Sequence, residues 1–485
     1  MTDLLVLPVR DDAPDAWTQT YGAPFETALA DARKTKGVVM VVPPSGPKRL
    51  AVVAAAEGDE GWRTAAAGAA RLARALGAET VVVAAPAAEA AGPLAEGFAL
   101  GLYRYDRYRT APDTTDLTFE VRVEGGGGEA AVAAARARAA AVNAARDLVN
   151  RAPDEKMPAE LAELMAEGAR AAGLSVEVWD KSRIEDEKMG GLLGVNRGSL
   201  DPPRFVVLRH RGGAGGAPVV LVGKGVTYDT GGLSLKPTKN SMDKMKADMG
   251  GAAAVYGAML ALAASEAEDE VVALIPMSDN RPGGRAYAPG DVLTMHSGAT
   301  VEVMNTDAEG RLLLADALSY ARTLAPRLVV DVATLTGAQG VALGDRVAAA
   351  VVRPGAEALA EAARQAGERS GDLAWPLPLY PHFREHLKSP VADLSNVGGP
   401  LAGTLTAAAF LEHFTHADGE PEDGRRGAPN AGEPAYPWLH LDIARPAFLD
   451  AVAGVHPVGA TGFGVRLLVD LLAALPEALE TGAAS

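Results

Sequence analysis

The sequence contains no cysteine. Disulfide bonds, thiolate metal sites and a cysteine nucleophile are therefore excluded. Aromatic residues are also scarce, at 5%, although apolar residues make up 48% of the 485 positions. Much of the apolar content is alanine and valine, which is typical of tightly packed α/β layers. We therefore expect large cores built mainly from small side chains.

Positive charge is in deficit as well, because the formal net charge is −16 and neither Lys nor Arg forms a long run. This balance argues against a general nucleic-acid-binding or anionic-membrane-binding protein. No stretch offers about 18 uninterrupted apolar residues, so no membrane span is expected. The first eight residues, MTDLLVLP, lack the basic region and long apolar run of a secretory signal and instead predict a β-strand. We therefore expect a cytoplasmic protein.

Two motifs of common hydrolases are missing too. None of the eight histidines falls in an H-E-x-x-H motif, and G-x-S-x-G does not occur. A histidine-bound single-zinc protease and a serine hydrolase with that motif are therefore not supported. We expect packing or surface positions, not metal ligation, for His382, His386, His413, His416, His440 and His456.

The length of 485 residues suggests two to three domains. The clearest break is the run Gly125–Gly128, which is too flexible for the interior of a helix or strand. An Ala- and Arg-rich helix is expected directly after it. We predict an N-terminal α/β domain at residues 1–128, a linker helix at 129–150 and a larger C-terminal α/β domain at 151–485.

Short apolar runs alternate with helical stretches in both parts of the chain. In the first part we expect strands at 4–9, 37–42, 50–54 and 80–84 and helices at 61–76 and 87–102. In the second part we expect strands at 175–179, 205–208, 219–222, 271–276 and 328–333 and helices at 159–172, 251–264, 312–324 and 356–367. The second pattern predicts a mixed or largely parallel sheet covered by helices on both faces, with ligands at the carboxyl ends of its strands. Residues 416–435, rich in Gly, Pro and acids, predict a mobile surface loop.

Residues 305–312, N-T-D-A-E-G-R-L, join an expected strand to an expected helix. Asp307 and Glu309 are two residues apart, so in an extended backbone both carboxylates would point to the same side. Gly310 is a flexible joint, and Arg311 lies near the helix start, where free amides attract anions. This combination suits hard metal ions and a charged intermediate. By itself the stretch fits equally well a solvated acidic turn with Arg311 as its ion-pair partner.

Two further segments carry charged residues just after expected strands. Residues 223–236 form a Gly-rich run with Lys224, Asp229 and Lys236, and its glycines match neither G-x-G-x-x-G nor G-x-x-x-x-G-K-[ST]. A nucleotide loop is therefore not supported. Asp248 opens an Ala-rich helix, where an aspartate is also a common helix cap.

Charge connects the segments if they converge, because one cleft would then hold the carboxylates of Asp229, Asp248, Asp307 and Glu309. Lys236 and Arg311 cannot neutralise these groups, and unpaired buried carboxylates would have to take up protons. Two divalent cations would balance the four charges. Lys224 would then have its pKa lowered by the cations and could bind a metal as a neutral amine. Without metals, the alternative for Lys224 is an ion pair with Asp229.

Several segments match one family in the same order. They are G-K-G-V-T-Y-D-T-G-G-L-S-L-K at 223–236, M-K-A-D-M-G-G-A at 245–252, N-R-P-G-G-R-A-Y-A-P-G-D-V at 280–292, N-T-D-A-E-G-R-L at 305–312, A-T-L-T-G-A at 333–338 and G-A-T-G-F-G-V-R-L-L at 459–468. From about residue 145 onward the chain resembles the leucyl (cytosol) aminopeptidase family of dinuclear metallopeptidases. The resemblance implies a catalytic metallopeptidase domain that acts on peptides with a free N-terminal amine.

The resemblance also implies roles for single residues. Two divalent metal ions, Zn²⁺ or Mn²⁺ with Mg²⁺ or Co²⁺ as further options, would share the site. One would be held by Asp229, Asp307 and Glu309, and the other by Lys224, Asp229, Asp248 and Glu309. An activated water would attack the scissile carbonyl, Lys236 would stabilise the oxyanion, and Arg311 would hold a bicarbonate that acts as general base. The α-amine of the substrate would bind a metal, so that only the first residue is released.

The pocket for the first side chain would be lined by Met245, Thr334, Gly337 and Ala460. These residues are mostly small or apolar, which is consistent with Leu or Met as the first residue of the substrate. For Met245 and Ala460, ordinary core packing is an equal alternative. Asn305 would either orient the substrate or only cap its own turn.

Two features depart from the family pattern: the length of residues 416–435 and Arg445, where the family usually has a small residue. Both bear on subunit contacts or access to the cleft. The family assembles as hexamers around an interior cavity, which implies a homohexamer. Two alternative functions are a non-catalytic DNA-binding or architectural role, disfavoured by the acidic balance, and metal-dependent phosphoester hydrolysis, which usually adds histidines.

Overall fold

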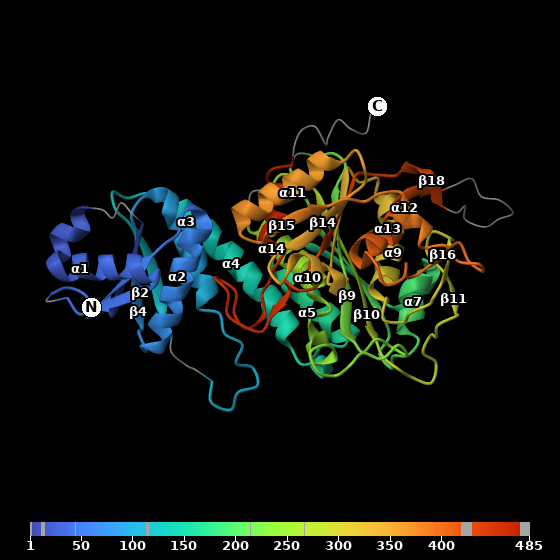
Figure 1. The fold of residues 1–485 in the computed structure, drawn as a ribbon, viewed down its shortest axis with the longest axis horizontal. Helices are drawn as coiled ribbons and strands as arrows, with labels where there is room; N and C mark the ends of the chain where they lie inside the picture. Colours follow the sequence, from blue (N-terminus) through green and yellow to red (C-terminus); the bar gives the residue numbers. More distant parts are fainter. Residues whose placement is uncertain are drawn as a thin grey trace. The chain divides into compact units, whose positions relative to one another are not determined.

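The computed structural model describes residues 2–10, 15–43, 45–112, 116–213, 215–265, 267–418 and 429–475. The chain divides into two compact units, Met1–Asn143 with Leu449–Gly459, and Ala144–Phe448 with Ala460–Ser485 (Figure 1). The division falls within helix α4 (Glu129–Asn150), whose bounds are those expected for the linker helix. The four glycines before α4 all have positive φ angles, between 84° and 88°, which explains why this run contains no other residue type.

A five-stranded sheet forms the centre of the first unit, in the order β2-β3-β1-β4-β5. β1, β3, β4 and β5 are parallel, and β2 runs antiparallel to β3. The strands are β1 (Leu4–Val9), β2 (Val38–Val41), β3 (Arg49–Ala54), β4 (Thr80–Ala85) and β5 (Thr118–Val123). The helices are α1 (Asp15–Thr35), which is broken at Gly22, α2 (Gly58–Ala75) and α3 (Ala88–Gly101).

Successive residues of β1 build two separate cores, because neighbouring side chains of a strand point to opposite faces. Leu4 and Val6 pack with α2 and α3 on one face. Leu5, Leu7 and Val9 pack with α1 on the other face. The sheet is therefore covered on both sides, as the alternation of strands and helices in the sequence predicts.

Helices α2 and α3 touch through glycines. A Cβ atom at Gly97 of α3 would lie 2.2 Å from the backbone oxygen of Arg63, and one at Gly101 would lie 2.5 Å from the Cα of Ala67. Both distances are far below van der Waals contact, so the two backbones approach as closely as they do only because these side chains are absent.

The second unit is built on a nine-stranded sheet in the order β15-β14-β19-β13-β8-β10-β7-β6, with β9 paired to the second half of β10. The central strands β19, β13, β8 and β10 are parallel, whereas β7, β6 and β14 introduce antiparallel pairs. The strands are β6 (Ser175–Trp179), β7 (Arg204–His210), β8 (Val219–Gly223), β9 (Gly225–Asp229), β10 (Val271–Asn280), β13 (Leu328–Ala333), β14 (Ala348–Val352), β15 (Ala374–Leu377) and β19 (Trp438–Asp442). The mixed sheet confirms the predicted α/β class.

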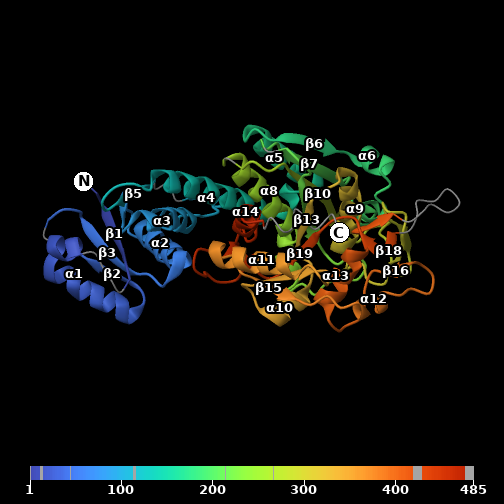
Figure 2. The same cartoon turned by 90° about the horizontal axis from the view of Figure 1, so that it is seen from above.

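Helices cover both faces of this sheet. Figure 2 shows α5, α8, α14 and α11 on one side and α9 and α13 on the other. The α-helices are α5 (Pro158–Ala171), α6 (Lys181–Asp186), α7 (Gly190–Asn196), α8 (Gly250–Ala263), α9 (Gly310–Ala321), α10 (Gly337–Leu343), α11 (Glu357–Ser370), α12 (His382–Glu385), α13 (Gly403–His413) and α14 (Val465–Leu472). Three 3₁₀ turns are η1 (Pro153–Glu155), η2 (Met242–Ala247) and η3 (Arg322–Leu324). Short peripheral strands are β11 (Val292–Thr294), β12 (Thr300–Glu302), β16 (Leu394–Ser395), β20 (Phe448–Leu449) and β21 (Gly459–Ala460).

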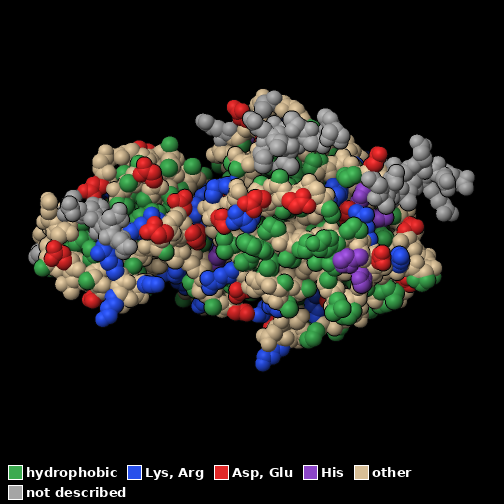
Figure 3. All heavy atoms as spheres, turned by 45° about the horizontal axis from the view of Figure 1, so that its top comes forward, with side chains coloured by type: hydrophobic (Ala, Val, Ile, Leu, Met, Phe, Trp, Pro, Cys, Tyr) green, Lys and Arg blue, Asp and Glu red, His purple; other side chains and the backbone are tan. Residues whose placement is uncertain are grey.

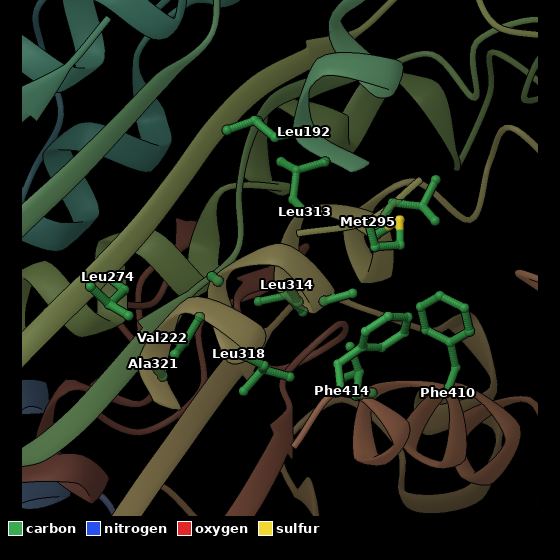
Figure 4. Packing of buried hydrophobic residues seen from close by; sticks show 14 of the residues in the cluster. Leu192, Val222, Leu274, Met295, Leu313, Leu314, Leu318, Ala321, Phe410 and Phe414 are labelled. Atoms are coloured by element: carbon green, nitrogen blue, oxygen red, sulfur yellow. The ribbon is translucent and has the colours of Figure 1, made fainter. Parts of the chain in front are cut away.

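Helix α9 lies at the centre of the larger core. Leu313, Leu314 and Leu318 point from it in several directions, toward the sheet residues Val222 and Leu274 and toward α13 (Figure 4). A helix that is apolar on nearly all sides must be buried on nearly all sides. The start of α9 is therefore fixed in space by packing on every side.

The turn before α9 differs from the prediction. We expected an extended backbone that aligns Asp307 with Glu309, but the strand β12 ends at Glu302 and residues 306–307 form a turn. Glu309 already has helical angles (φ −79°, ψ −40°), and the helix begins at Gly310, earlier than expected. The two carboxylates therefore leave the chain from a turn and a helix start, not from one strand face.

The predicted mobile loop at 416–435 is wrong at both ends. β17 (His416–Asp418) and β18 (Pro429–Pro434) pair antiparallel there. Residues 419–428 lie outside the described residues.

In the described ranges, no helix is long and apolar enough to cross a membrane.

The close approach of α2 and α3 generates a prediction. Gly97→Ala should destabilise the protein by about 1–3 kcal/mol, because the added methyl group must push the two helix backbones apart. Gly68→Ala in α2 is the matched control: nothing lies within 4 Å of its Cβ position, and alanine should stabilise the helix by about 0.5–1 kcal/mol. Urea unfolding followed by circular dichroism measures both, and equal stability of the two variants would contradict the packing argument.

Candidate metal centre

The candidate site lies at the carboxyl ends of the central parallel strands, where ligands gather in such sheets. Lys224 occupies the break between β8 and β9, and Asp229 is the last residue of β9. Thr334 directly follows β13. Asp248 lies between η2 and α8, and Glu309 directly precedes α9. Residues far apart in sequence thus meet at one edge of the sheet.

Three of the predicted carboxylates form a compact group. Asp229, Asp248 and Glu309 each place a carboxylate oxygen within 4.8 Å of the others. All three are at most 5% exposed. The Asp307 side chain is more open, at 31% exposure, and joins the group through Lys236. The structure therefore brings all four predicted carboxylates together, although Asp307 lies at the rim.

Two lysines bridge the carboxylates. Lys224 Nζ lies 2.7 Å from Asp248 Oδ1 and 2.9 Å from Glu309 Oε1. Lys236 Nζ lies 2.8 Å from Asp229 Oδ2 and 2.5 Å from Asp307 Oδ1. The alternative ion pair of Lys224 with Asp229 is therefore wrong, because Asp229 pairs with Lys236 instead.

Burial and charge shift the pKa values of this group strongly. Burial, reinforced by repulsion from Glu309, raises the pKa of Asp229 to about 7. Burial also raises the pKa of Asp248 and of Asp307. For Glu309 burial acts in the same direction, but Lys224 and Lys236 outweigh it and lower its pKa. In the absence of metal, the carboxylates around Lys224 overcome its desolvation and raise its pKa, so Lys224 is an ammonium group.

The donor set fits divalent cations. Asp248 Oδ2 and Glu309 Oε2 are buried and have no hydrogen-bond partner among the described residues. Unpartnered buried carboxylate oxygens are costly, and they are also the ligands that hard divalent ions prefer. Four carboxylates face only two lysine ammonium groups, so added positive charge would relieve the remaining repulsion.

The helix-cap alternative for Asp248 is not supported. Met249 is the residue that precedes α8, and its cap position has no side-chain hydrogen bond. Asp248 Oδ1 instead accepts hydrogen bonds from Lys224 Nζ (2.7 Å) and from Thr334 Oγ1 (2.9 Å). The Asp248 side chain therefore points into the cluster and not at the helix backbone.

A hydrogen-bonded frame that we did not predict orients Asp229. Asn280 Nδ2 donates to Asp229 Oδ1 (2.8 Å) and to the backbone oxygen of Thr306 (2.9 Å). Tyr287 donates to the same Thr306 oxygen (2.8 Å). Asn280 opens the segment 280–292, which the sequence marked only through its family resemblance. An asparagine at the end of a buried strand was the available signal, because a buried amide needs partners.

Arg311 is buried in the first turn of α9. Its Nη1 donates to the backbone oxygen of Asn396 (2.7 Å), while its Nε has no hydrogen-bond partner among the described residues. Burial lowers its pKa to about 10, which leaves it charged at neutral pH. In the described chain it forms no ion pair with Asp307 or Glu309, so the solvated-turn alternative is not supported.

The predicted pocket residues differ in their surroundings. Thr334 contacts the cluster, since its backbone oxygen accepts from Lys224 Nζ (2.9 Å). Gly337 opens α10, and nothing lies within 4 Å of its Cβ position, so space for a ligand exists there. Met245 is half-buried in η2. Ala460 is fully buried, as its packing alternative requires. Asn305 Oδ1 accepts from the Asp307 backbone N–H (2.8 Å), which is the turn-capping role.

The histidines occupy the expected packing and surface positions. His440 is fully buried, and its Nδ1 lies 2.6 Å from Asp331 Oδ1. His413 is half-buried and His416 is buried, both near Glu412. His382 and His386 are exposed. Among the described residues, the group able to hold a metal contains carboxylates alone.

Comparison with known proteins places these features in context. Residues 143–469 match the profile described as "Cytosol aminopeptidase family, catalytic domain", and residues 27–112 match "Cytosol aminopeptidase family, N-terminal domain". A probable cytosol aminopeptidase of Geobacter sulfurreducens is 45% identical over 388 residues, which cover 79% of this chain and 74% of the relative. One from Micrococcus luteus is 43% identical, over 85% of this chain and 81% of the relative.

Two solved structures of related enzymes are similar to this chain over nearly its whole length. The bottromycin maturation enzyme BotP in complex with Mn is 37% identical, with a TM-score of 0.83, and the match covers 98% of this chain and 100% of that one. A tomato leucine aminopeptidase variant is 30% identical with the same TM-score, over 97% of this chain and 94% of that one. Fold, site and comparisons together define a metal-dependent exopeptidase. More particularly, the chain belongs to the cytosol aminopeptidase family, which confirms the resemblance found in the sequence.

The frame around Asp229 generates a prediction. Asn280→Ala should weaken Mn²⁺ binding about 10–100-fold, because partners that orient a metal ligand contribute that much to affinity. Isothermal titration of the metal-stripped protein measures the change.

Asn196→Ala is the matched control. It removes another buried amide, which donates to Asp201 and Ser278, without touching the carboxylate cluster. Its Mn²⁺ affinity should match that of the unmodified protein. If both variants bind Mn²⁺ as tightly as that protein, Asn280 does not orient the site.

Proposed function

We propose that this metal-dependent aminopeptidase releases apolar N-terminal residues, Leu or Met above all, from peptides with a free amine. The observation that carries the proposal is the buried cluster of Asp229, Asp248 and Glu309, whose oxygens remain partly unpartnered. At neutral pH the carboxylates of such a cluster must either take up protons or gain additional positive charge nearby. The charge would come from divalent cations.

The placement of the side chains supports two metal positions. Asp229, Asp307 and Glu309 would hold one ion, and Lys224, Asp229, Asp248 and Glu309 the other. When bound, divalent ions polarise the scissile carbonyl and lower the pKa of a water molecule. Manganese is supported by the BotP complex, and zinc, magnesium and cobalt suit the same oxygen and amine donors. Lys224 would lose its proton on metal binding, because two nearby cations disfavour an ammonium group.

Lys236 and Arg311 would act on the reacting groups. Carboxylates around Lys236 overcome its desolvation and raise its pKa, so it is a charged donor suited to an oxyanion. Arg311 keeps its buried Nε without a partner among the described residues, which suits a bound anion at the start of α9. We assign that anion as bicarbonate, which would take the proton of the attacking water as general base.

Thr334, Gly337 and Met245 would surround the first side chain of the peptide. The free space at Gly337 and the thioether of Met245 favour an unbranched or γ-branched apolar group. Ala460 would line the same pocket, and Asn305 would orient the substrate. The substrate amine would bind at the metal centre, which limits cleavage to the first residue.

We further propose a cytoplasmic homohexamer. Large apolar side chains remain exposed in the second unit, among them Val341, Trp375, Tyr380, Val391 and Leu401. Figure 3 shows hydrophobic side chains gathered on the face of the larger unit seen in that view. Contiguous exposed apolar surface commonly marks a protein interface, and copies of the same chain would cover it.

Substitution of the proposed metal-binding residues and removal of the metal both test the mechanism. Asp307→Ala and Glu309→Ala should each abolish release of p-nitroaniline from leucyl p-nitroanilide, with the circular dichroism spectrum retained. Exhaustive chelation should do the same to the unmodified protein, and added Mn²⁺ should restore activity. Full activity after chelation, or turnover of phenyl phosphate in place of the leucyl substrate, would overturn the assignment.

Arg311 provides a second test. Arg311→Ala should lower kcat about 10²–10⁴-fold, the usual contribution of a positioned general base, with a smaller change in KM. Added bicarbonate should stimulate the unmodified enzyme and leave the variant unchanged. Arg364→Ala is the control, because among the described residues this arginine pairs with Glu361 and Glu368 on the surface of α11. A variant at Arg311 with unchanged kcat would remove bicarbonate from the mechanism.

A further inference from the structure

The first unit contains a pocket of its own, with a volume of about 770 Å³. Pockets of roughly 300–1,000 Å³ are typical of small-molecule sites. Its lining comes entirely from the first unit, from the ends of β1 and β3, the end of α1 and one face of α2. None of the proposed metal ligands takes part in it.

The pocket lies at a topological switch point. β1 and β3 are adjacent and parallel. The helix that follows β1 packs on one face of the sheet, and the helix that follows β3 packs on the opposite face. Chain connections that leave adjacent strands toward opposite faces open a crevice at their carboxyl ends, and this is where open α/β sheets bind ligands.

The inner part of the pocket is apolar. Val9, Val53 and Ala65 line it and are buried, at 5% exposure or less. Gly68 of α2 also lines it, and nothing lies within 4 Å of its Cβ position. A flat or compact apolar group therefore finds both a surface and free space between the strand ends and α2.

The outer part of the pocket is basic. Arg71 and Lys36 line it, and neither side chain has a hydrogen bond or an ion pair to another described residue. Arg71 is half-buried, and burial alone lowers its pKa, since no carboxylate offsets the desolvation. The acidic residues of the lining are already paired, Glu57 with Arg10 and Glu60 with Arg63. Two cations thus remain available to an anion.

We propose that this switch-point pocket binds a small phosphate-bearing molecule, with its apolar body against Val9 and Val53 and its phosphate between Arg71 and Lys36. A surface arginine or lysine alone indicates only a solvated rim. Here a formed cavity, a switch point and two uncommitted cations coincide, and a dianionic phosphate matches the two charges.

Three probes test the proposal on the intact, Mn²⁺-loaded protein by isothermal titration. Adenosine 5′-monophosphate carries both the anion and a flat body, adenosine lacks the anion, and inorganic phosphate lacks the body. The monophosphate should bind saturably and at least about tenfold more tightly than either other probe, because charged hydrogen bonds and apolar burial each contribute on that scale.

Matched variants locate the site. Arg71→Met should weaken binding of the monophosphate about tenfold or more, and Gly68→Leu should abolish it by filling the cavity. Arg74→Met removes the same charge from the same helix outside the pocket lining and should change affinity less than twofold. Lys36→Met and Lys34→Met form a second such pair near the end of α1. All five variants should hydrolyse leucyl p-nitroanilide at the unmodified rate.

Three outcomes overturn the proposal. The first is the absence of saturable binding by any probe. The second is binding that Arg71→Met and Gly68→Leu leave unchanged, which would place the probe at the metal centre. The third is equal affinity for the monophosphate and adenosine, which would show that Arg71 and Lys36 do not bind the phosphate. Each is independent of aminopeptidase activity, so it leaves the proposed function untouched.

Discussion

Mutual repulsion among buried carboxylates is the constraint on which the second unit depends. Asp229, Asp248 and Glu309 crowd into one buried volume, with Asp307 at its edge. Lys224 and Lys236 each bridge two of these groups and so allow four acids to remain close together. The compensation is incomplete, since buried carboxylate oxygens still lack partners among the described residues. This residual demand for positive charge links folding to metal binding, because the ions that serve the chemistry also relieve the repulsion.

The sheet supplies the rigidity that such a cluster needs. Lys224 lies in the break between β8 and β9, and Asp229 ends β9. Asp248 and Glu309 lie at the starts of α8 and α9, which pack on opposite faces of the sheet. Asn280, at the end of β10, connects Asp229 to the turn before α9. Three separate segments of the chain therefore hold the four carboxylates, and no local change can move the group as a whole.

The two units apply the same architectural rule to different chemistry. In the larger unit, carboxylates with unmet hydrogen bonds collect at the carboxyl ends of parallel strands, and in the smaller unit Arg71 and Lys36 line a pocket that also includes the ends of β1 and β3. In the larger unit they are acidic and buried, which suits cations. In the smaller unit they are basic and lie at the mouth of an apolar crevice, which suits an anion with an apolar body. The formal net charge of −16 gives no hint of this local division.

The sequence by itself determined the elements with dense or alternating apolar runs. β1, β6 and β13 have the predicted bounds, because short runs of this kind favour strands. It also determined the family, through several segments that match the family's motifs in the same order. The tertiary structure decided the turn at Asp307, the pairing of Lys236 with Asp229, the frame around Asn280 and the pairing of β17 with β18. The physical reason is that local propensity encodes the conformation of a segment and not the partner of a side chain. This holds for Lys236, which pairs with a nearby residue, and for Asn280, whose partner Asp229 lies 51 residues away.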